Sequence, residues 1–566
     1  MGEQNALNRW DTGQLEELWV ARGLDRRDFL KLVGAGAGMT VLTTLATAPG
    51  GVAAQDAAAS QVSLEWSKPQ TLGPLFSTAG SEQQVERLVF GALVKMTNAL
   101  EAVPDLATAV DVSDDATVYT FSLNEAATFN DGTPLTSADV VFTIERAVDT
   151  RTGSYWKGRF MGLVGAAEFA DQQAETIEGL TAPDEHTVVF TLSAPDSAFL
   201  PTLADFTGLG ILPKHILESV APENLQEDAF NLAPSVGAGP YSFVTYESDQ
   251  YVELEANPTF WGEAPAIQKI FMRILLPDVA VAELEAGAVD VISVSIDDME
   301  RLAENPQLTI VSIESPSLDS ISFNLEREYF QDVRVRQALQ YAIDRESITS
   351  QLYKGQAIVR NSPIFGPAWM GVPEGLNEYA FDPDQARTLL QEAGWDSSQE
   401  VELMFSANAT STFQSMVAVL QQQWADVGFN VSLLQVDSAE LNRKLVTDGE
   451  YDLYIGGGGV YGAEPSICAK YYLTANFAPG GANNTHYSNP EVDQLFADGR
   501  AIGDEAERKA IYTQIAQILN EELPSIFLWS PNTNFAVNTR LLGFEAPAYV
   551  NNRLWNAEEW SLAEGS

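Results

Sequence analysis

The spacing of hydrophobic residues in the first half of the chain predicts a mixture of strands and helices. Apolar and polar residues alternate along Val118–Leu123 and again along residues 188–192, as in strands with one buried face. Residues 129–134 carry the Asp-Gly and Pro chemistry of a turn. A helix is then expected after Thr136, which caps it together with Asp139 in the capping-box position.

Two prolines separate regions with different rhythms. Before Pro277, three alternating segments are predicted to be strands of one antiparallel sheet, at 241–244, 252–255 and 270–274. After Pro277, helices and short strands alternate, which predicts a twisted and mostly parallel sheet. The helices are expected at 279–286, 333–352, 384–393, 412–427, 439–447, 490–499 and 505–519, and the strands at 289–292, 431–434 and 452–455. Beyond Pro524, the apolar residues 526–529 predict a further strand.

The composition fits a folded protein of several domains with an acidic surface. The chain has 566 residues, of which 45% are hydrophobic, a fraction typical of globular proteins. It carries 79 Asp and Glu residues against 31 Lys and Arg, a formal net charge of −48. Such a charge repels nucleic acids and anionic membranes, so neither is expected as a partner. The acidity fits either work in concentrated salt or an ordinary acidic surface, and both interpretations stay open.

Cysteine and histidine are too scarce for two kinds of site. Cys468 is the single cysteine, so an intrachain disulfide framework is impossible. The three histidines, His186, His215 and His486, are scattered, and a histidine-rich metal centre is not expected. The sequence has no G-x-S-x-G, H-E-x-x-H or phosphate-loop motif. No cofactor is therefore predicted, and a secreted hydrolase that uses paired carboxylates is the less favoured alternative.

The N-terminus has the pattern of an export signal. Arg26 and Arg27 precede a mildly apolar stretch at residues 32–48 and a run of small residues at 52–54. The arginine pair and the residues after it resemble a twin-arginine signal. Residues 1–54 are expected to direct export to the periplasm or to the outer face of the cytoplasmic membrane. Whether the signal is cleaved or kept as an anchor stays open.

Six motifs follow one another along the rest of the chain. They are FNDGTPLTSADVVF at 129–142, GAGPY at 237–241, NPTFWG at 257–262, Asn324 with VRVRQAL at 333–339 and AIDR at 342–345, a segment at 379–395, and Tyr487 with residues 489–493. In sequence and order they resemble the motifs of extracellular solute-binding proteins of family 5, the peptide- and nickel-binding receptors of ATP-driven importers. The resemblance extends over residues 60–555.

The resemblance implies an α/β fold with two lobes around a cleft. This is a periplasmic-binding-protein-like fold of type II, in its large cluster with an extra inserted subdomain. Lobe I is expected at residues 55–276, with the subdomain at about 96–185, and lobe II at 277–524, after which 525–566 return to lobe I. The two changes of rhythm fit segments that cross between the lobes. A ligand that contacts both lobes favours the closed state, which a transporter can recognise.

The function that the resemblance implies is capture of a solute without chemistry. The protein is expected to be the substrate-binding component of an ABC importer, with a peptide or peptide-like ligand. An oligosaccharide receptor of the same fold is the alternative, and a sensory receptor or chaperone on this scaffold would have the same cleft. The expected partners are the ligand, the permease subunits and their cytoplasmic ATPases, and the protein is expected to be a monomer.

A run of four glycines marks the expected ligand loop. Gly457, Gly459 and Gly462 spell G-x-G-x-x-G after a predicted strand. A dinucleotide site would need an acidic residue about 20 positions on, and none lies between Glu464 and Glu491. The glycines instead let the backbone approach a ligand at the end of a strand.

The loop after the glycines bears on the choice of ligand. In peptide-binding relatives, as the resemblance implies, it carries an Asp that pairs with the ammonium group of the ligand. Tyr461 stands at that position here. A hydrogen bond to a charged group contributes about 1.5–3 kcal/mol, so its loss counts against short free peptides. Glu464 is a candidate replacement, with a solvated loop acid as the plain alternative.

Four more residues are predicted to contact the ligand. Arg360 and Trp369 lie in a proline-rich loop where, as the resemblance implies, relatives bind their ligands. Arg360 would pair with a carboxylate and Trp369 would offer an aromatic platform, against the alternatives of a surface arginine and a packed tryptophan. Phe76 and Thr78 belong to the first cleft-facing loop of the family.

Overall fold

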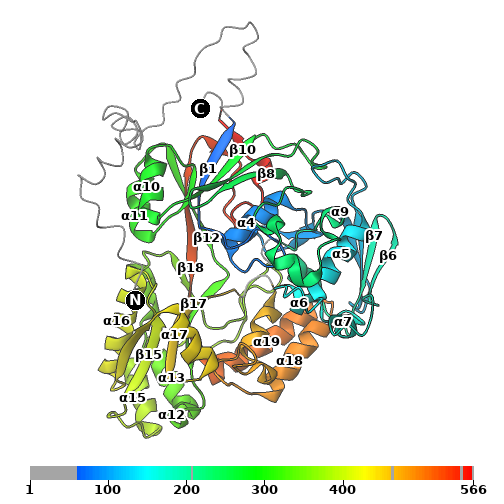
Figure 1. The fold of residues 1–566 in the computed structure, drawn as a ribbon. Coiled ribbons are helices and arrows are strands. Elements are labelled where there is room, and N and C mark those ends of the chain that lie inside the picture. Colours follow the sequence, from blue (N-terminus) through cyan, green and yellow to red (C-terminus); the bar gives the residue numbers. More distant parts are fainter. Residues whose placement is uncertain (1–59, 205–207, 461–463, 549–551, 564–566) are drawn as a thin grey trace, which may run out of the picture. The chain divides into compact units, whose positions relative to one another are not determined.

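The computed structural model describes residues 60–204, 208–460, 464–548 and 552–563 (Figure 1). They belong to one compact unit, Ala57–Ser566. The predicted export signal at residues 1–54 lies outside the described residues. None of the helices within the described ranges combines the length and apolar character that a membrane crossing requires.

Twelve strands form one mixed sheet through this unit (Figure 1). Ten of them pair in the order β16 (Val431–Val436), β15 (Val401–Ser406), β17 (Leu453–Val460), β13 (Ser317–Phe323), β18 (Ser525–Asn538), β11 (Val291–Ser293), β1 (Gln61–Trp66), β10 (Lys269–Ile274), β9 (Tyr251–Ala256) and β8 (Tyr241–Glu247). The other two, β12 (Leu308–Glu314) and β14 (Ala357–Val359), pair with β18. As predicted, β8, β9 and β10 pair antiparallel.

Strand β18 connects the two halves of this sheet. Its residues 525–531 pair with β13 and β14, and its residues 532–538 pair with β11 and β12. Strands β12 and β13 follow each other along the chain, so a second crossing lies beside β18. The lobe ranges expected from the sequence stay a prediction. Strands β11 and β12 both follow Pro277. The ladders place β11 beside β1, and they place both strands beside the second half of β18.

A separate antiparallel sheet lies mostly in the segment predicted as the inserted subdomain, with one strand just beyond its predicted end. Its order is β4 (Ala107–Val112), β5 (Val118–Leu123), β7 (Thr187–Thr191) and β6 (Leu180–Asp184). Tyr119, Phe121 and Leu123 are buried, which confirms the alternation along β5. Helix α5 (Ser137–Val148) packs on this sheet and begins with the predicted capping box.

Most of the helices predicted after Pro277 are present. They are α10 (Pro277–Glu285), α15 (Pro383–Glu392), α16 (Ser411–Asp426), α17 (Ser438–Asn442), α18 (Pro490–Ala501) and α19 (Glu505–Glu522), with α11 (Ile296–Ala303) in addition. The prediction of one helix at 333–352 is wrong, because the segment divides into α13 (Val333–Tyr341) and α14 (Arg345–Gln351). The Asp344 carboxylate accepts a hydrogen bond from the Ser347 N–H at 3.0 Å and caps α14, so the chain starts a new helix there.

The prediction of a mostly parallel sheet after Pro277 is only partly right. Strand β15 pairs in parallel with β16 and β17, which matches the alternation of strands and helices. Strand β13, however, pairs antiparallel with both β17 and β18. The reason is that β13 continues the crossing begun by β12, and this crossing runs opposite to β18.

One arginine of each of the VRVRQAL and AIDR motifs is buried and stabilises the fold from inside. Arg336 is buried and donates hydrogen bonds to the carbonyls of Glu522 at 3.0 Å and Leu523 at 2.9 Å, at the end of α19. Arg345, also buried, donates to the carbonyl of Phe527 at 2.9 Å. A cation at a helix C-terminus satisfies carbonyls that the helix itself leaves unpaired.

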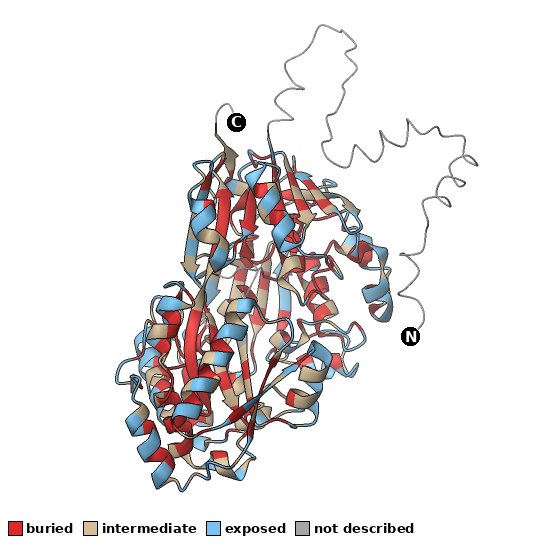
Figure 2. Cartoon of the chain, turned by 90° about the vertical axis from the view of Figure 1, so that its left-hand side faces the viewer, coloured by how far each residue is buried: buried red, intermediate tan, exposed pale blue. Residues whose placement is uncertain are grey.

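Separate hydrophobic cores lie on the two sides of the crossing. One contains Trp66 of β1 and Trp560, and another contains Trp424 of α16 and Trp529 of β18. Figure 2 shows buried residues along the strands and exposed residues on the outer faces of the helices. Cys468 is buried and its thiol contacts the Pro465 carbonyl at 3.2 Å, and burial raises the pKa of this thiol.

Candidate ligand-binding site

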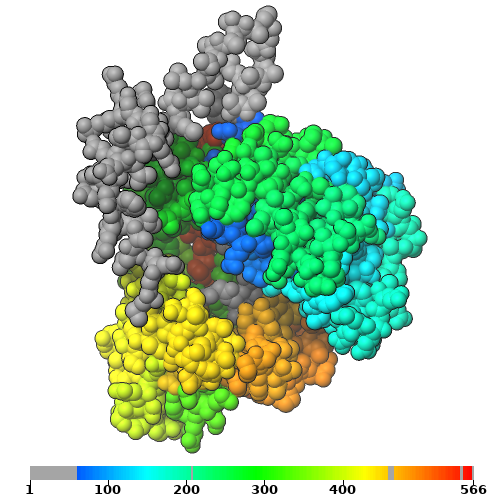
Figure 3. All heavy atoms as spheres, in the orientation of Figure 1, coloured from blue at the N-terminus to red at the C-terminus, as the bar shows by residue number. Residues whose placement is uncertain are grey.

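The structure has two cavities of interest, and one of them lies beside the crossing strands. The first, the hinge cavity, has a volume of about 620 Å³ and is lined by residues in the ranges 293–297, 406–413, 454–456 and 531–534 with Asp319 and Tyr353. The second, the outer cavity, has a volume of about 750 Å³ and is lined by residues in the ranges 100–119, 197–201, 367–369 and 503–508 with Glu464. Figure 3 shows a hollow between the green and blue segments and the yellow and orange segments.

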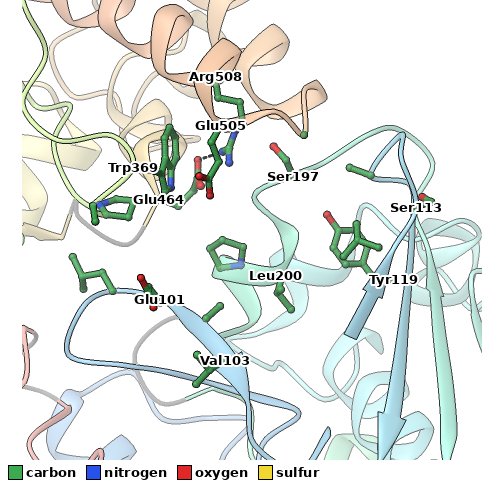
Figure 4. A pocket seen from close by; sticks show the side chains of 18 of the residues that line it. Glu101, Val103, Ser113, Tyr119, Ser197, Leu200, Trp369, Glu464, Glu505 and Arg508 are labelled. Carbon is green, nitrogen blue, oxygen red and sulfur yellow. Dashed lines mark hydrogen bonds and ion pairs between the residues drawn. The ribbon is translucent and has the colours of Figure 1, made fainter. Parts of the chain in front are cut away.

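The outer cavity contains two of the predicted site residues, Trp369 and Glu464. The Glu464 carboxylate forms an ion pair with Arg508 at 2.6 Å, and both side chains are almost fully buried. The Arg508 guanidinium lies over the Trp369 ring, 4.8 Å from its centroid. Figure 4 shows these three side chains together on one wall, opposite Tyr119 and Leu200. The geometry joins Glu464 to Arg508, and a role of Trp369 or Glu464 in ligand binding stays a prediction.

Arg360 lies at the crossing strands and outside the linings of both cavities. Its guanidinium pairs with the Glu314 carboxylate, donates a hydrogen bond to Ser530 Oγ at 2.9 Å and covers the Phe365 ring. Burial lowers the pKa of Arg360 to about 10. These contacts tie the end of β12 to β18, and the predicted carboxylate-binding role stays a prediction.

Phe76 and Thr78, two of the other predicted residues, line neither cavity. Phe76 is partly buried and packs against the core that contains Trp66. Thr78 is exposed, and its backbone N–H donates a hydrogen bond to Glu82 Oε2 at 3.2 Å, at the start of α4 (Gly80–Val89). Tyr461 lies outside the described residues.

Asp319 is a site residue that the sequence reasoning missed. It lines the hinge cavity from β13, is only 5% exposed and accepts a hydrogen bond from Trp529 Nε1 at 3.0 Å. The ladders of β13 with β17 and with β18 both shift register next to Asp319. Such bulges re-aim side chains beside functional sites. The available signal was an acid in the same alternating set of positions as the apolar residues Ile321 and Phe323.

Strand β17 presents a backbone edge to the hinge cavity. It pairs with β13 from Leu453 to Val460, but its ladder with β15 has only Leu453 and Tyr454. Ile455 and Gly456 then line the hinge cavity. Backbone N–H and C=O groups on such an edge need partners, and an extended chain can supply them.

The paired sheet halves, the crossing strands and the cavities beside them define a two-lobed ligand-binding protein. Residues 101–479 match the family model of bacterial extracellular solute-binding proteins, family 5, middle region. The chain belongs to this family, as the six motifs predicted.

Individual relatives agree with this assignment. The chain is 31% identical, over 503 residues, to a Brucella melitensis protein named as an ABC transporter peptide-binding protein. The matched region covers 87% of this chain and 91% of that protein. The oligopeptide-binding protein AppA of Bacillus subtilis, solved with a nonapeptide, is 25% identical with a TM-score of 0.74 and covers 89% of this chain and 99% of that chain. NikZ of Campylobacter jejuni, solved with Ni(L-His), is also 25% identical, with a TM-score of 0.73 and the same coverage. These structures confirm the predicted two-lobed α/β fold.

The ion pair in the outer cavity yields a first prediction. Glu464→Gln keeps the shape of the side chain but leaves the buried Arg508 guanidinium without its counter-charge. We expect the free energy of unfolding, measured by urea denaturation, to fall by about 3 kcal/mol. Glu505→Gln is the matched control, because Glu505 lines the same cavity but is exposed. Unchanged stability of Glu464→Gln would contradict a stabilising role for this ion pair.

The buried acid of the hinge cavity yields a second prediction. Burial raises the pKa of Asp319 to about 6, above its ordinary value of 3.8. The folded state therefore binds this proton more tightly than the unfolded state, and Asp319 lowers stability progressively as the pH rises from about 4 through about 6. We expect Asp319→Asn to be more stable than the parent protein at pH 7, by up to about 3 kcal/mol, with the difference vanishing near pH 4.

The comparison of urea denaturation between the two proteins at several pH values isolates Asp319 from the many other acids. Asp297→Asn is the control, since Asp297 is exposed at the same cavity. A stability difference for Asp319→Asn that is the same at pH 4 and pH 7 would contradict the assignment.

Proposed function

We propose that this protein captures a peptide or peptide-like solute between its lobes and delivers it to the membrane permease of an ABC importer. The observation that supports this most directly is the edge of β17 at the hinge cavity. An extended peptide can add to such an edge as a further strand, with main-chain hydrogen bonds for affinity and neighbouring pockets for side chains. A sugar has no comparable ladder of donors and acceptors, so the edge favours a peptide over an oligosaccharide.

The position of the hinge cavity suits a receptor whose closed state is favoured by a bound ligand. Its lining combines residues 293–297, which follow β11, with residues 406–413, which follow β15. A ligand there contacts both halves of the sheet and stabilises their closed arrangement by its differential contacts. The relative AppA was solved with a nonapeptide, which agrees with a peptide ligand. The proposed partners are permease subunits with cytoplasmic ATPases, and the ligand leaves without chemical change.

Calorimetry with synthetic peptides tests the proposal. We expect extended peptides of three to nine residues to bind with micromolar affinity, about −8 kcal/mol. Analogues with N-methylated backbone amides at alternate positions should bind about tenfold or more weakly, because each lost amide donor removes a hydrogen bond of the added strand. Oligosaccharides of similar size are the comparison. Binding of a sugar without binding of any peptide, or hydrolysis of the ligand, would contradict the proposal.

We also propose that residues 1–54 are a twin-arginine export signal. Replacement of Arg26 and Arg27 together by lysine should keep the protein in the cytoplasm of the producing cell, because the arginine pair is the feature that the pathway reads. Arg22→Lys, four residues upstream of Arg26, is the control and should leave export intact. Immunoblots of cell fractions measure the outcome. Normal export of the double lysine variant would refute the twin-arginine assignment.

A further inference from the structure

The described polar groups around the hinge cavity include acidic and neutral side chains but no cation. Its lining residues include Asp319 and the exposed Asp297 but no Lys, Arg or His. The side-chain oxygens of Asn532 and Asn534 are buried and have no hydrogen-bond partner. Buried amide oxygens normally find a donor, so a donor from a ligand is the simplest complement to this cavity.

Asp319 differs from other buried acids of this protein. Asp290 pairs with Arg540 at 2.6 Å, Glu464 with Arg508 at 2.6 Å, and Glu558 with Arg87 at 3.0 Å. Among the described residues, the Asp319 carboxylate accepts one hydrogen bond, from Trp529, although a carboxylate offers about four acceptor positions. Glu86 also has no cation partner in the described residues, but it lines neither cavity. Asp319 therefore combines incomplete pairing with a place on a cavity wall.

Three aromatic side chains share the lining of the hinge cavity with Asp319. Tyr353, Tyr454 and Phe413 line the hinge cavity, and Trp529 lies behind Asp319 with its ring centroid 5.3 Å from that of Tyr353. Aromatic faces attract organic cations and contribute more where water is excluded. The described lining lacks the cluster of three or more acidic, histidine or cysteine ligands that would hold a metal ion. The combination of one acid with aromatic walls favours an organic cation.

One feature of the hinge cavity favours an anionic ligand over a cationic one. The N-terminus of α16 contributes residues 411–413 to the lining, and helix N-termini favour anions. The Thr410 side chain, however, already accepts a hydrogen bond from the Phe413 N–H at 3.2 Å. The Ser295 side chain caps α11 in the same way. With the caps in place, the buried carboxylate is the stronger determinant of ligand charge.

We propose that the hinge cavity binds a positively charged group of the ligand, an ammonium or guanidinium, with Asp319 as its counter-ion and the amide oxygens of Asn532 and Asn534 as further acceptors. This assignment rests on the proposed peptide-binding function and makes it more specific. Because Asp319 and the two asparagines lie on the crossing strands, while residues 293–297 and 406–413 approach from both sides, the bound cation would be enclosed by both halves of the sheet.

Calorimetry with matched peptides tests the charge preference. The first pair is trialanine and N-acetyl-trialanine. The second pair is acetyl-Ala-Lys-Ala-amide and acetyl-Ala-norleucine-Ala-amide, which differ only in the side-chain ammonium. We expect the protein to bind the cationic member of at least one pair about ten- to hundredfold more tightly than the neutral member. In Asp319→Asn this ratio should fall to about threefold or less, whereas Asp297→Asn should keep it.

The pH dependence gives a second readout. The preference for the cationic peptide should decline as the pH falls through about 6, where Asp319 takes up a proton. Tyr353 and Tyr454 also face Asp319, and burial raises their pKa values, so neither titrates in this range. The variant Asp297→Asn is the control for the exposed carboxylate of Asp297, which lines the same cavity.

The outcomes separate this inference from the proposed function. If peptides bind but Asp319→Asn keeps the full cation preference, the role of Asp319 is overturned while the peptide receptor stands. If no peptide binds, the proposed function fails, and thermal shifts with butylamine and guanidinium-bearing agmatine decide the inference. Stabilisation of the parent protein but not of Asp319→Asn would support the cation site, and no stabilisation of either protein would overturn it.

Discussion

The arrangement of the two lobes depends on β18, a strand that belongs to both halves of one sheet. β18 is hydrogen-bonded to β13 and β14 along its first half and to β11 and β12 along its second. Neither half can slide along β18 without breaking its ladder, so the motion left to them is a bend at the crossing. The hinge cavity lies at this point, where a small ligand can touch strands that serve both halves.

Charged groups have two different relations to this framework. Arg336, Arg345 and Arg360 are buried and donate hydrogen bonds to carbonyls, a hydroxyl and a carboxylate of the protein, which fixes helix ends and the crossing. Asp319 is left incomplete at the cavity wall. An unpaired buried charge opposes folding, and functional sites are where folded proteins retain such groups. This contrast separates the arginines, which stabilise the fold, from Asp319, which is available to a ligand.

Local chemistry made much of the fold predictable, whereas long-range pairing did not. The alternation along β5 and the cap at Thr136 are encoded within a few residues, and both were predicted. The break at Asp344 was missed because the apolar period continues across it while a cap competes with the helix. The polar run from Asn532 to Asn534 hid the full length of β18. Asp319 was missed because its burial comes from neighbours that are distant in the sequence.

The burial of Cys468 has a practical consequence for measurements of the bend between the two halves of the sheet. With the only thiol of the chain enclosed and its deprotonation disfavoured, maleimide reagents find little to attack on the parent protein. Cysteines introduced at two exposed positions on opposite sides of the cleft would then carry a fluorophore pair without removal of the native residue. Single-molecule energy transfer could follow opening and closing directly, in a chain whose interior is unaltered.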